Sequence, residues 1–294
     1  MASSQIGPGV PEHVDRSTGR PPVERDVLTP SSIRVDGRRA VVTGAGRGIG
    51  RATALALARF GADVAVLDRI EADVARTAAE INEIGRRSCV GVLDVRDGDA
   101  VDSWFEQVGR EFGGVDVLVN NAGGGFFAPV LDVSDGGRSA LIAENFSQVL
   151  DVTATCVPLM RSGGAIVNVT SIEGHRAGPG FGVYSAMKAA VENLTRTLAL
   201  ELADRRIRVN AVAPDMIPTP GDAALVDASG AVADRNWALT PWPDAGHPDD
   251  VAAAIVWLAS PMSGFVTGTT VHVDGGTMAA GGWKRPAVGD GWVL

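Results

Sequence analysis

Hydrophobic residues in this chain follow two alternating patterns. Short runs rich in Val, Ile and Ala, typical of buried strands, alternate with longer stretches of helical period. The expected strands are residues 40–42, 64–67, 89–92, 115–119, 166–169, 209–212 and 270–273. The expected helices lie near residues 48–60, 71–84, 98–111, 139–157, 183–203 and 249–259. This order predicts an α/β protein whose seven-stranded parallel sheet is doubly wound, as in a Rossmann-type fold.

Three stretches fall outside this alternation. Residues 1–33 contain prolines among polar residues without a helical or strand period, which predicts a flexible N-terminal arm. Residues 216–247 contain several prolines and two tryptophans, and a long loop within a compact fold predicts a lid. Residues 281–294 form a glycine- and tryptophan-containing C-terminal tail. We therefore expect a single domain over residues 34–280.

Composition narrows the possible partners and the compartment. The formal net charge of −9 opposes binding to nucleic acids and anionic membranes. No apolar run is long enough to span a membrane, and no secretory signal is apparent, so we expect a cytoplasmic protein. Cys89 and Cys156 are too far apart for a metal clip or redox pair and are expected to be buried thiols. His13, His247 and His272 show no metal-ligand spacing, so we expect no metal.

A glycine-rich turn stands between the first expected strand and the first expected helix. Its sequence is Thr43-Gly44-Ala45-Gly46-Arg47-Gly48-Ile49-Gly50. Glycines allow a backbone to approach a pyrophosphate closely, and the N-terminus of the following helix attracts negative charge. This context predicts a dinucleotide site.

The second expected strand ends at an acidic residue. Asp68 follows Gly50 by eighteen residues, where a carboxylate can accept hydrogen bonds from an adenosine ribose and repel a 2′-phosphate. Arg47 and Arg69 instead favour the 2′-phosphate of NADP, because guanidinium groups bind phosphate oxygens. The pattern favours NAD as cofactor and leaves NADP possible.

Three further residues indicate proton transfer. Tyr184 is the only tyrosine, and Lys188, one of two lysines, follows it by four residues. On a helix this spacing places both side chains on one face, so the ammonium can lower the pKa of the phenol. Ser171 follows the strand at 166–169 and can donate a hydrogen bond to a substrate oxygen, although Thr170 is a rival for this role.

Taken together, these motifs resemble the single-domain branch of the short-chain dehydrogenase/reductase family over about residues 36–280. The resemblance is carried by Thr43 to Gly50, Asp94-Val95, Asn120-Asn121-Ala122-Gly123, Asn145, Ser171, Tyr184, Lys188, Pro214 with Thr219, and Val273-Asp274-Gly275-Gly276.

The resemblance implies four catalytic residues. Tyr184 would exchange a proton with the substrate oxygen, and Ser171 would bind that oxygen. Lys188 would also bind the nicotinamide ribose, and Asn145 would anchor a water in the proton relay. The implied cofactor-binding residues are Gly44, Gly46, Arg47, Gly48, Ile49, Gly50, Asp68, Arg69, Asp94, Val95, Asn121, Ala122, Gly123, Tyr184, Lys188, Pro214, Ile217 and Thr219.

The chain departs from the family pattern in two places. Asp215 stands where the family usually has a glycine after Pro214, which would alter the approach to the nicotinamide. The stretch 134–144 lacks the bulky aromatic residue that often precedes the asparagine at position 145.

The reaction expected from these residues is reversible hydride transfer between a nicotinamide and a secondary alcohol or ketone. The candidate pocket residues suggest a bulky, mostly apolar substrate, steroid-like or an acyl thioester. They are Gly124, Gly125, Phe126, Phe127, Glu173, His175, Pro179, Phe181, Trp237 and Trp242. Glu173 and His175 could instead form a solvated loop pair.

Two alternatives stay open. One is an NADPH-dependent reductase of 3-oxoacyl carrier-protein or CoA thioesters, which Arg47 and Arg69 would favour. The other is a dinucleotide-sensing module without turnover. The family resemblance further implies a homotetramer in which the tails pack near a neighbouring subunit's site.

Overall fold

The computed structural model describes residues 27–220, 240–286 and 291–293. The chain divides into two compact units, Met1–Ser31 and Ser32–Leu294. Most of the expected arm, the middle of the expected lid with Trp237, and part of the expected tail lie outside the described residues. Every strand in the described ranges belongs to the second unit.

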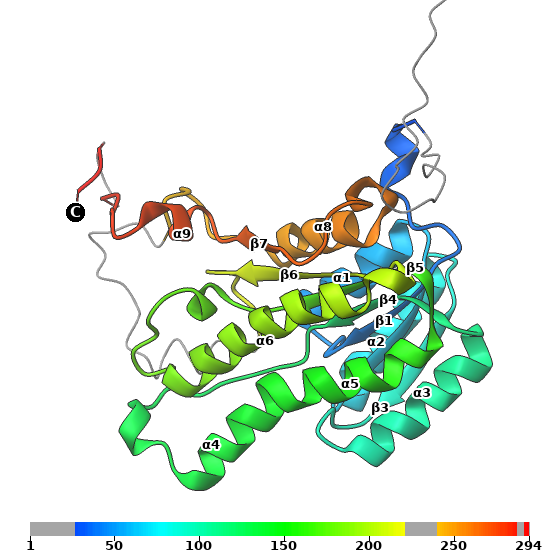
Figure 1. Cartoon of the computed structure of the whole chain (residues 1–294), viewed down its shortest axis with the longest axis horizontal. Helices are drawn as coiled ribbons and strands as arrows, with labels where there is room; N and C mark the ends of the chain where they lie inside the picture. The colour runs from blue at the N-terminus through cyan, green and yellow to red at the C-terminus, as the bar shows by residue number, and fades with distance from the viewer. Residues whose placement is uncertain (1–26, 221–239, 287–290, 294) are drawn as a thin grey trace, which may run out of the picture. The chain divides into compact units, whose positions relative to one another are not determined.

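The sheet has seven parallel strands in the order β3-β2-β1-β4-β5-β6-β7, which confirms the predicted Rossmann-type topology (Figure 1). From β1 the following strands are added on one side of the sheet, and from β4 on the other side, so the order of strands reverses between β1 and β4. Ligands bind at such a switch point in open α/β sheets. The strands are β1 Arg39–Thr43, β2 Asp63–Asp68, β3 Ser88–Val92, β4 Val115–Asn120, β5 Met160–Val169, β6 Arg208–Pro214 and β7 Thr270–Val273.

Helices cover both faces of the sheet. One apolar cluster joins α1, α2 and α8 to one set of alternating strand residues, and a second joins α3, α5 and α6 to the other set. Val42 faces the first cluster and its neighbour Val41 the second, as expected when successive side chains point to opposite faces. The long helices are α1 Gly48–Arg59, α2 Glu71–Glu83, α3 Gly98–Phe112, α4 Asp135–Ile142, α5 Gln148–Cys156, α6 Gly182–Glu201 and α8 Pro248–Ala259; the short α9 spans Thr277–Ala280.

The two edge strands are less buried than the sequence suggests. The expectation of uniformly buried strands is wrong for β3, which alternates, and for β7, in which no residue is fully buried. Each pairs with only one neighbour, so one side of the strand stays accessible. By contrast, every residue of β1 is buried.

The helical stretch expected at residues 139–157 is confirmed, but it begins earlier and is not α-helical throughout. α4 begins at Asp135, because the Ser134 side chain accepts a hydrogen bond from the Gly137 N–H at 3.1 Å and caps the helix. A π-helical turn, Ala143–Ser147, then separates α4 from α5. Such turns occur frequently at functional sites.

Both cysteines are free and buried, as expected. Burial raises the pKa of the Cys89 thiol to about 12 and that of Cys156 still further. In the described part of the chain, no helix is long and apolar enough to cross a membrane.

Candidate active site

A cavity of about 1080 Å³ opens at the carboxyl ends of the central strands. Its wall includes the turn after β1, the ends of β2 and β5, the loop after β4, the Tyr184 face of α6 and the loop after β6. These segments are far apart in the chain, and the parallel sheet brings their ends to one edge.

The glycine-rich turn forms one end of this cavity. Gly44 has a φ of +63°, and a Cβ there would lie 2.9 Å from the Ala122 Cα. A Cβ on Gly50 would lie only 2.1 Å from the Gly44 carbonyl oxygen. The Asn121 amide nitrogen supports the turn by donating to the carbonyl oxygens of Thr43 at 3.0 Å and Gly44 at 3.1 Å. The turn therefore presents bare backbone at a helix N-terminus, as a dinucleotide pyrophosphate requires.

The carboxylate of Asp68 joins this turn to the end of β2. It accepts from the Gly46 N–H at 2.9 Å and from the Ile70 N–H at 3.0 Å. The side chain thus has a fixed orientation in the cavity wall, beside Arg69. Among the described residues, Arg47 and Arg69 make no ion pair, so their guanidinium groups remain able to bind an anion.

The next acidic residue along the cavity is already paired. Asp94 accepts two hydrogen bonds from the Arg96 side chain, at 2.9 and 2.6 Å. These bonds hold the pKa of the Asp94 carboxyl below its usual value. Val95 lies beside it in the wall.

The structure distinguishes the two candidate hydroxyls after β5. Thr170 is buried and donates to the Val212 carbonyl oxygen at 3.0 Å, so its proton is already engaged. Ser171 lines the cavity, and its Oγ accepts from the Glu173 N–H at 3.2 Å. Because a hydroxyl retains its donor when it accepts, Ser171 can donate into the cavity.

Tyr184 and Lys188 lie one turn apart on α6, and both line the cavity. The Lys188 Nζ lies 5.4 Å from the centre of the Tyr184 ring and donates to the Val169 carbonyl oxygen at 3.0 Å. Burial lowers the pKa of Lys188 to about 8, and the Glu144 carboxylate acts in the opposite direction. The predicted spacing therefore does place a cation beside the phenol.

Asn145 lies at the centre of the π-turn, fully buried behind the cavity wall. Its amide nitrogen donates to the Gly124 carbonyl oxygen at 2.8 Å, and its Oδ1 accepts from the Gly124 N–H at 3.3 Å. The side chain thus binds both backbone groups of one glycine.

All but two of the predicted site residues line the cavity; the exceptions are Gly46 and Asn145. Gly46 donates its N–H to Asp68 instead, and Asn145 binds the backbone of Gly124, which does line the cavity. Sequence reasoning missed Glu144, whose side chain is part of the wall. The sequence did contain a signal for Glu144: it is an acidic residue next to the predicted asparagine, and extra glycines follow Gly123.

Four of the candidate pocket residues line the cavity: Gly124, Gly125, Glu173 and Phe181. Phe126, Phe127, Pro179 and Trp242 are not part of its wall. His175 points elsewhere: its Nε2 lies 2.6 Å from Glu192, and its ring lies 4.5 Å from that of His272. The idea that Glu173 and His175 form a solvated pair is wrong, since Glu173 pairs with Arg176 at 2.7 Å.

Asp215, at the position of the usual family glycine, is integrated into an ion-pair cluster. Arg176 lies 2.7 Å from Glu173 and 3.4 Å from Asp215. The Asp215 side chain also accepts from the Met216 N–H at 2.9 Å, and Met216 has a φ of +49°. The left-handed backbone conformation thus occurs one residue beyond Asp215, and the loop still lines the cavity.

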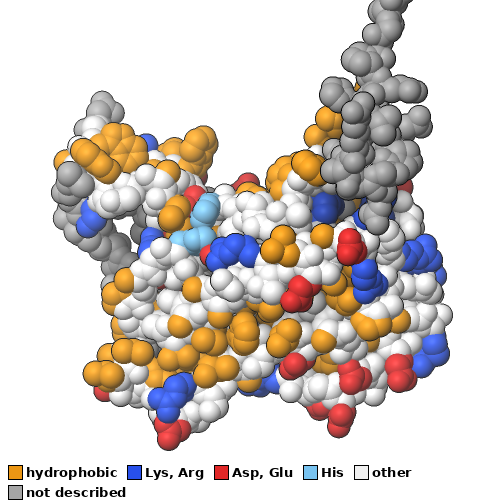
Figure 2. Space-filling view, viewed as in Figure 1, with side chains coloured by type: hydrophobic (Ala, Val, Ile, Leu, Met, Phe, Trp, Pro, Cys, Tyr) orange, Lys and Arg blue, Asp and Glu red, His pale blue; other side chains and the backbone are white. Residues whose placement is uncertain are grey.

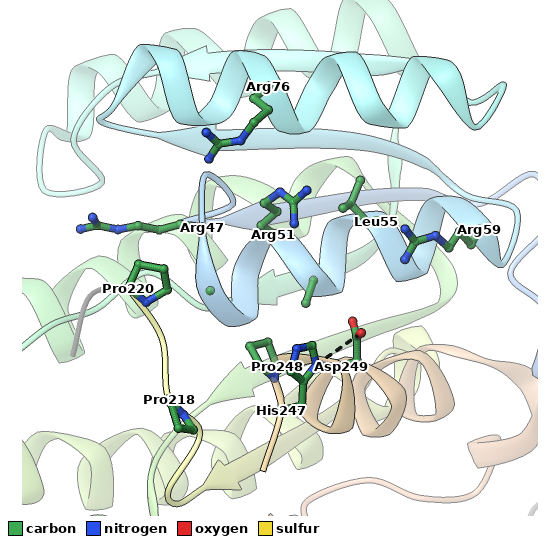
Figure 3. A pocket seen from close by; sticks show the side chains of 12 residues that line it. Arg47, Arg51, Leu55, Arg59, Arg76, Pro218, Pro220, His247, Pro248 and Asp249 are labelled. Atoms are coloured by element: carbon green, nitrogen blue, oxygen red, sulfur yellow. Dashed lines mark hydrogen bonds and ion pairs between the residues drawn. The ribbon is translucent and has the colours of Figure 1, made fainter. Parts of the chain in front are cut away.

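A second hollow of about 480 Å³ lies beside the glycine-rich turn, between α1, α2 and the start of α8 (Figure 3). Four arginines line it, of which Arg51 pairs with Glu80 at 2.5 Å and Arg76 with Asp73 at 2.9 Å. Arg47 lines both this hollow and the larger cavity. Across the described residues, no group of His, Cys, Asp and Glu side chains is arranged to bind a metal ion.

Comparisons with known proteins agree with this geometry. Residues 44–278 match the family model described as enoyl-(acyl carrier protein) reductase. A 3-oxoacyl-[acyl-carrier-protein] reductase of Thermotoga maritima is 38% identical over 248 residues, covering 83% of this chain and 99% of that protein. A 3beta-hydroxysteroid dehydrogenase of Eggerthella lenta is 38% identical over 253 residues, covering 82% and 93%.

A solved structure provides the corresponding three-dimensional likeness. Carveol dehydrogenase of Mycobacterium avium, in complex with NAD, superposes with a TM-score of 0.78 at 31% identity and covers 84% of this chain and 99% of its own. Fold, cavity and relatives agree that the chain belongs to the short-chain dehydrogenase/reductase family, as an oxidoreductase that acts on CH–OH groups with NAD(P).

Proposed function

We propose that Tyr184 is the general acid and base of a reversible oxidation of a secondary alcohol to a ketone. The observation that carries the proposal is the meeting of Ser171, Tyr184 and Lys188 at one end of a glycine-walled cavity. The nicotinamide ring supplies or accepts the hydride when the cofactor is bound. In the oxidation, Tyr184 takes the hydroxyl proton while Ser171 donates a hydrogen bond to the same oxygen.

Lys188 supports this proton transfer electrostatically. Its ammonium has three donors, of which one is used by Val169, so two are available toward the cavity and the nicotinamide ribose. A positive charge 5.4 Å from the phenol ring favours the phenolate form of Tyr184. Asn145 fixes the backbone of Gly124 and with it the wall opposite α6.

We propose NAD as the preferred cofactor. The Asp68 carboxylate has both oxygens at the rim of the turn, where a 2′-phosphate would meet its negative charge. The NAD complex of carveol dehydrogenase supports this preference by similarity. The competing proposal, an NADPH-dependent reductase of 3-oxoacyl thioesters, is supported by the exposed Arg47 and Arg69 and by the Thermotoga maritima relative.

The substrate end favours a bulky, mostly apolar molecule. Phe127 stacks edge-on against Phe181 at 5.5 Å, and Phe181 against Tyr184 at 6.4 Å. Phe181 and Tyr184 line the cavity, and Phe127, which is 37% exposed and lies outside the wall, continues this aromatic row toward the surface. Apolar alicyclic alcohols and steroid-like ketones match such a row.

The test begins with titration of the protein by NADH and NADPH at one salt concentration, followed through energy transfer from tryptophan. Salt is kept constant because it screens phosphate contacts. Tighter binding of NADH, followed by turnover of bulky secondary alcohols, would support the proposal. Tighter binding of NADPH with turnover of 3-oxoacyl thioesters would establish the competing one, and cofactor binding without any turnover would indicate a sensing module.

We further propose a homotetramer. Leu150 on α5 and Leu200 on α6 are 41% and 79% exposed. Hydrophobic side chains are spread over the face formed by α4, α5 and α6 (Figure 2). In the tail, Trp283 and Trp292 are half exposed beside the bridge between Lys284 and Val293. Sedimentation equilibrium that returns a monomer mass would contradict this assembly.

A further inference from the structure

Glu144 lies directly before Asn145 in the π-turn, and its half-buried side chain lines the cofactor cavity. The carboxylate lies against Gly124. A Cβ added to that glycine would be 2.9 Å from the Glu144 Oε1 and 3.4 Å from its Oε2. Glycine at position 124 therefore leaves the space that this carboxylate occupies.

The neighbouring glycine, Gly123, lies against the Lys188 ammonium group in the same way. A Cβ on Gly123 would lie 3.4 Å from the Lys188 Nζ and 3.0 Å from the Asn145 Oδ1. Asn145 in turn binds both backbone groups of Gly124. The ammonium and the carboxylate thus lie against two adjacent glycines of the cavity wall.

The other charged groups near Lys188 have partners of their own. Glu192, on the same helix, lies 2.6 Å from His175. After β5 and β6, Glu173 and Asp215 share Arg176. Apart from the phenol of Tyr184, this leaves Glu144 as the acidic group that acts on Lys188 among the described residues.

A buried ammonium without a compensating charge tends to lose its proton. Burial has moved the pKa of Lys188 down to about 8, and the Glu144 carboxylate opposes that shift. The second cation near Glu144 is Arg96, which is already paired with Asp94 at 2.6 Å. The carboxylate is therefore available to Lys188.

We propose that Glu144 is a positioning residue whose carboxylate keeps the Lys188 ammonium charged and thereby sets the alkaline limit of hydride transfer. This proposal rests on the proposed roles of Tyr184 and Lys188. When Lys188 loses its proton, the Tyr184 phenolate loses its neighbouring positive charge. The neutral amine also has one N–H fewer to donate to the nicotinamide ribose.

The scarcity of lysine allows a direct test. The chain contains two lysines, Lys188 and Lys284, so lysine labelled with ¹³C at Cε gives two side-chain signals, which a Lys284→Arg variant assigns. The pH titration of the Lys188 signal is then followed in the cofactor-free protein. In Glu144→Gln we expect its midpoint to fall by about one pH unit, the usual size for loss of one nearby charge.

Two matched variants separate charge from shape. Glu144→Asp keeps the charge and should retain a midpoint nearer to that of the wild type. Glu173→Gln removes another carboxylate from the same cavity, one that is paired with Arg176, and should leave the Lys188 midpoint in place. An equal shift in Glu173→Gln would overturn the specific role of Glu144.

The kinetic counterpart is the pH dependence of kcat for alcohol oxidation. In Glu144→Gln the alkaline limb should move to lower pH by the same interval as the Lys188 midpoint. An unchanged midpoint, or a changed midpoint with an unmoved alkaline limb, overturns the proposal. If the wild type turns over no alcohol or ketone, the proposed function fails, while the titration still decides whether Glu144 controls the charge of Lys188.

Discussion

The two ends of the cofactor cavity are built from different materials. The phosphate-turn end, residues 43–50 with Asp68, presents mainly backbone to the cavity: Gly44 and Gly50 leave no room for a Cβ, and Asp68 adds one carboxylate. The Tyr184 end consists of side chains from separate elements, with Ser171 after β5 and Lys188 on α6. One end depends on shape and the other on the placement of charge. Substitutions should therefore affect binding and stability at the first end and turnover at the second.

The largest effect is expected at the Tyr184 end. Tyr184→Phe removes the proton-transferring hydroxyl and should lower kcat by about 10²-fold or more, the usual scale for a general acid or base. The dissociation constant of NADH, measured by fluorescence titration, should change little. Full turnover in this variant would remove the basis for the contrast between the two ends.

At the phosphate-turn end, Gly50→Ala should act on binding and stability. The new Cβ would lie 2.1 Å from the Gly44 carbonyl oxygen, so the turn must shift, at a cost of about 1–3 kcal/mol. Urea unfolding and NADH titration measure the two consequences. Gly98→Ala, at the start of α3, is the control: apart from the adjoining residues and the backbone of its own helix, no atom lies within 4 Å of the new Cβ, so stability should stay within about 0.5 kcal/mol of the wild type.

A smaller change is expected from Asp68→Asn, which removes the negative charge but keeps the shape. The ratio of NADPH to NADH affinity should rise about tenfold, equivalent to about 1.4 kcal/mol. Competitive titration with both cofactors measures this ratio. A ratio that stays constant would mean that Asp68 serves only to bind the Gly46 and Ile70 N–H groups.

The smallest effect is expected in the arginine-lined hollow of Figure 3. Arg59 lines this hollow but not the cofactor cavity, so Arg59→Gln should change neither cofactor's affinity by more than about twofold. Arg47→Gln, at the wall shared by both spaces, should weaken NADPH binding more than NADH binding. Equal effects of the two variants would mean that the hollow contributes to the cofactor site.

The sequence predicts the phosphate-turn end well because that end is local. The glycines, the strand before them and the helix after them are contiguous. The expected strands recur in the structure, β7 with the expected bounds and the other six with altered ones. β5 begins six residues earlier than expected. The sequence did not predict this start, because the stretch 161–163 is exposed and lacks a strand-like apolar pattern.

The Tyr184 end was only partly predictable. Spacing along α6 places Lys188 beside Tyr184. The orientation of the Glu144 side chain depends on a π-turn, which a hydrophobic pattern of 3.6-residue period does not predict. In the same way, His175 lies outside the cavity wall and contacts Glu192 and His272, which are distant from it in sequence. Such pairings depend on tertiary structure.

The π-turn also separates two properties of this segment that a deletion would affect differently. It contains one residue more than an α-helical turn, so deletion of one residue there would restore a regular α-helix and keep the helical turns on both sides in register. Val152 and Cys156 would stay buried against the sheet, while Asn145 would lose its alignment with Gly124. A single-residue deletion at the π-turn should therefore preserve the fold and disrupt the cavity wall.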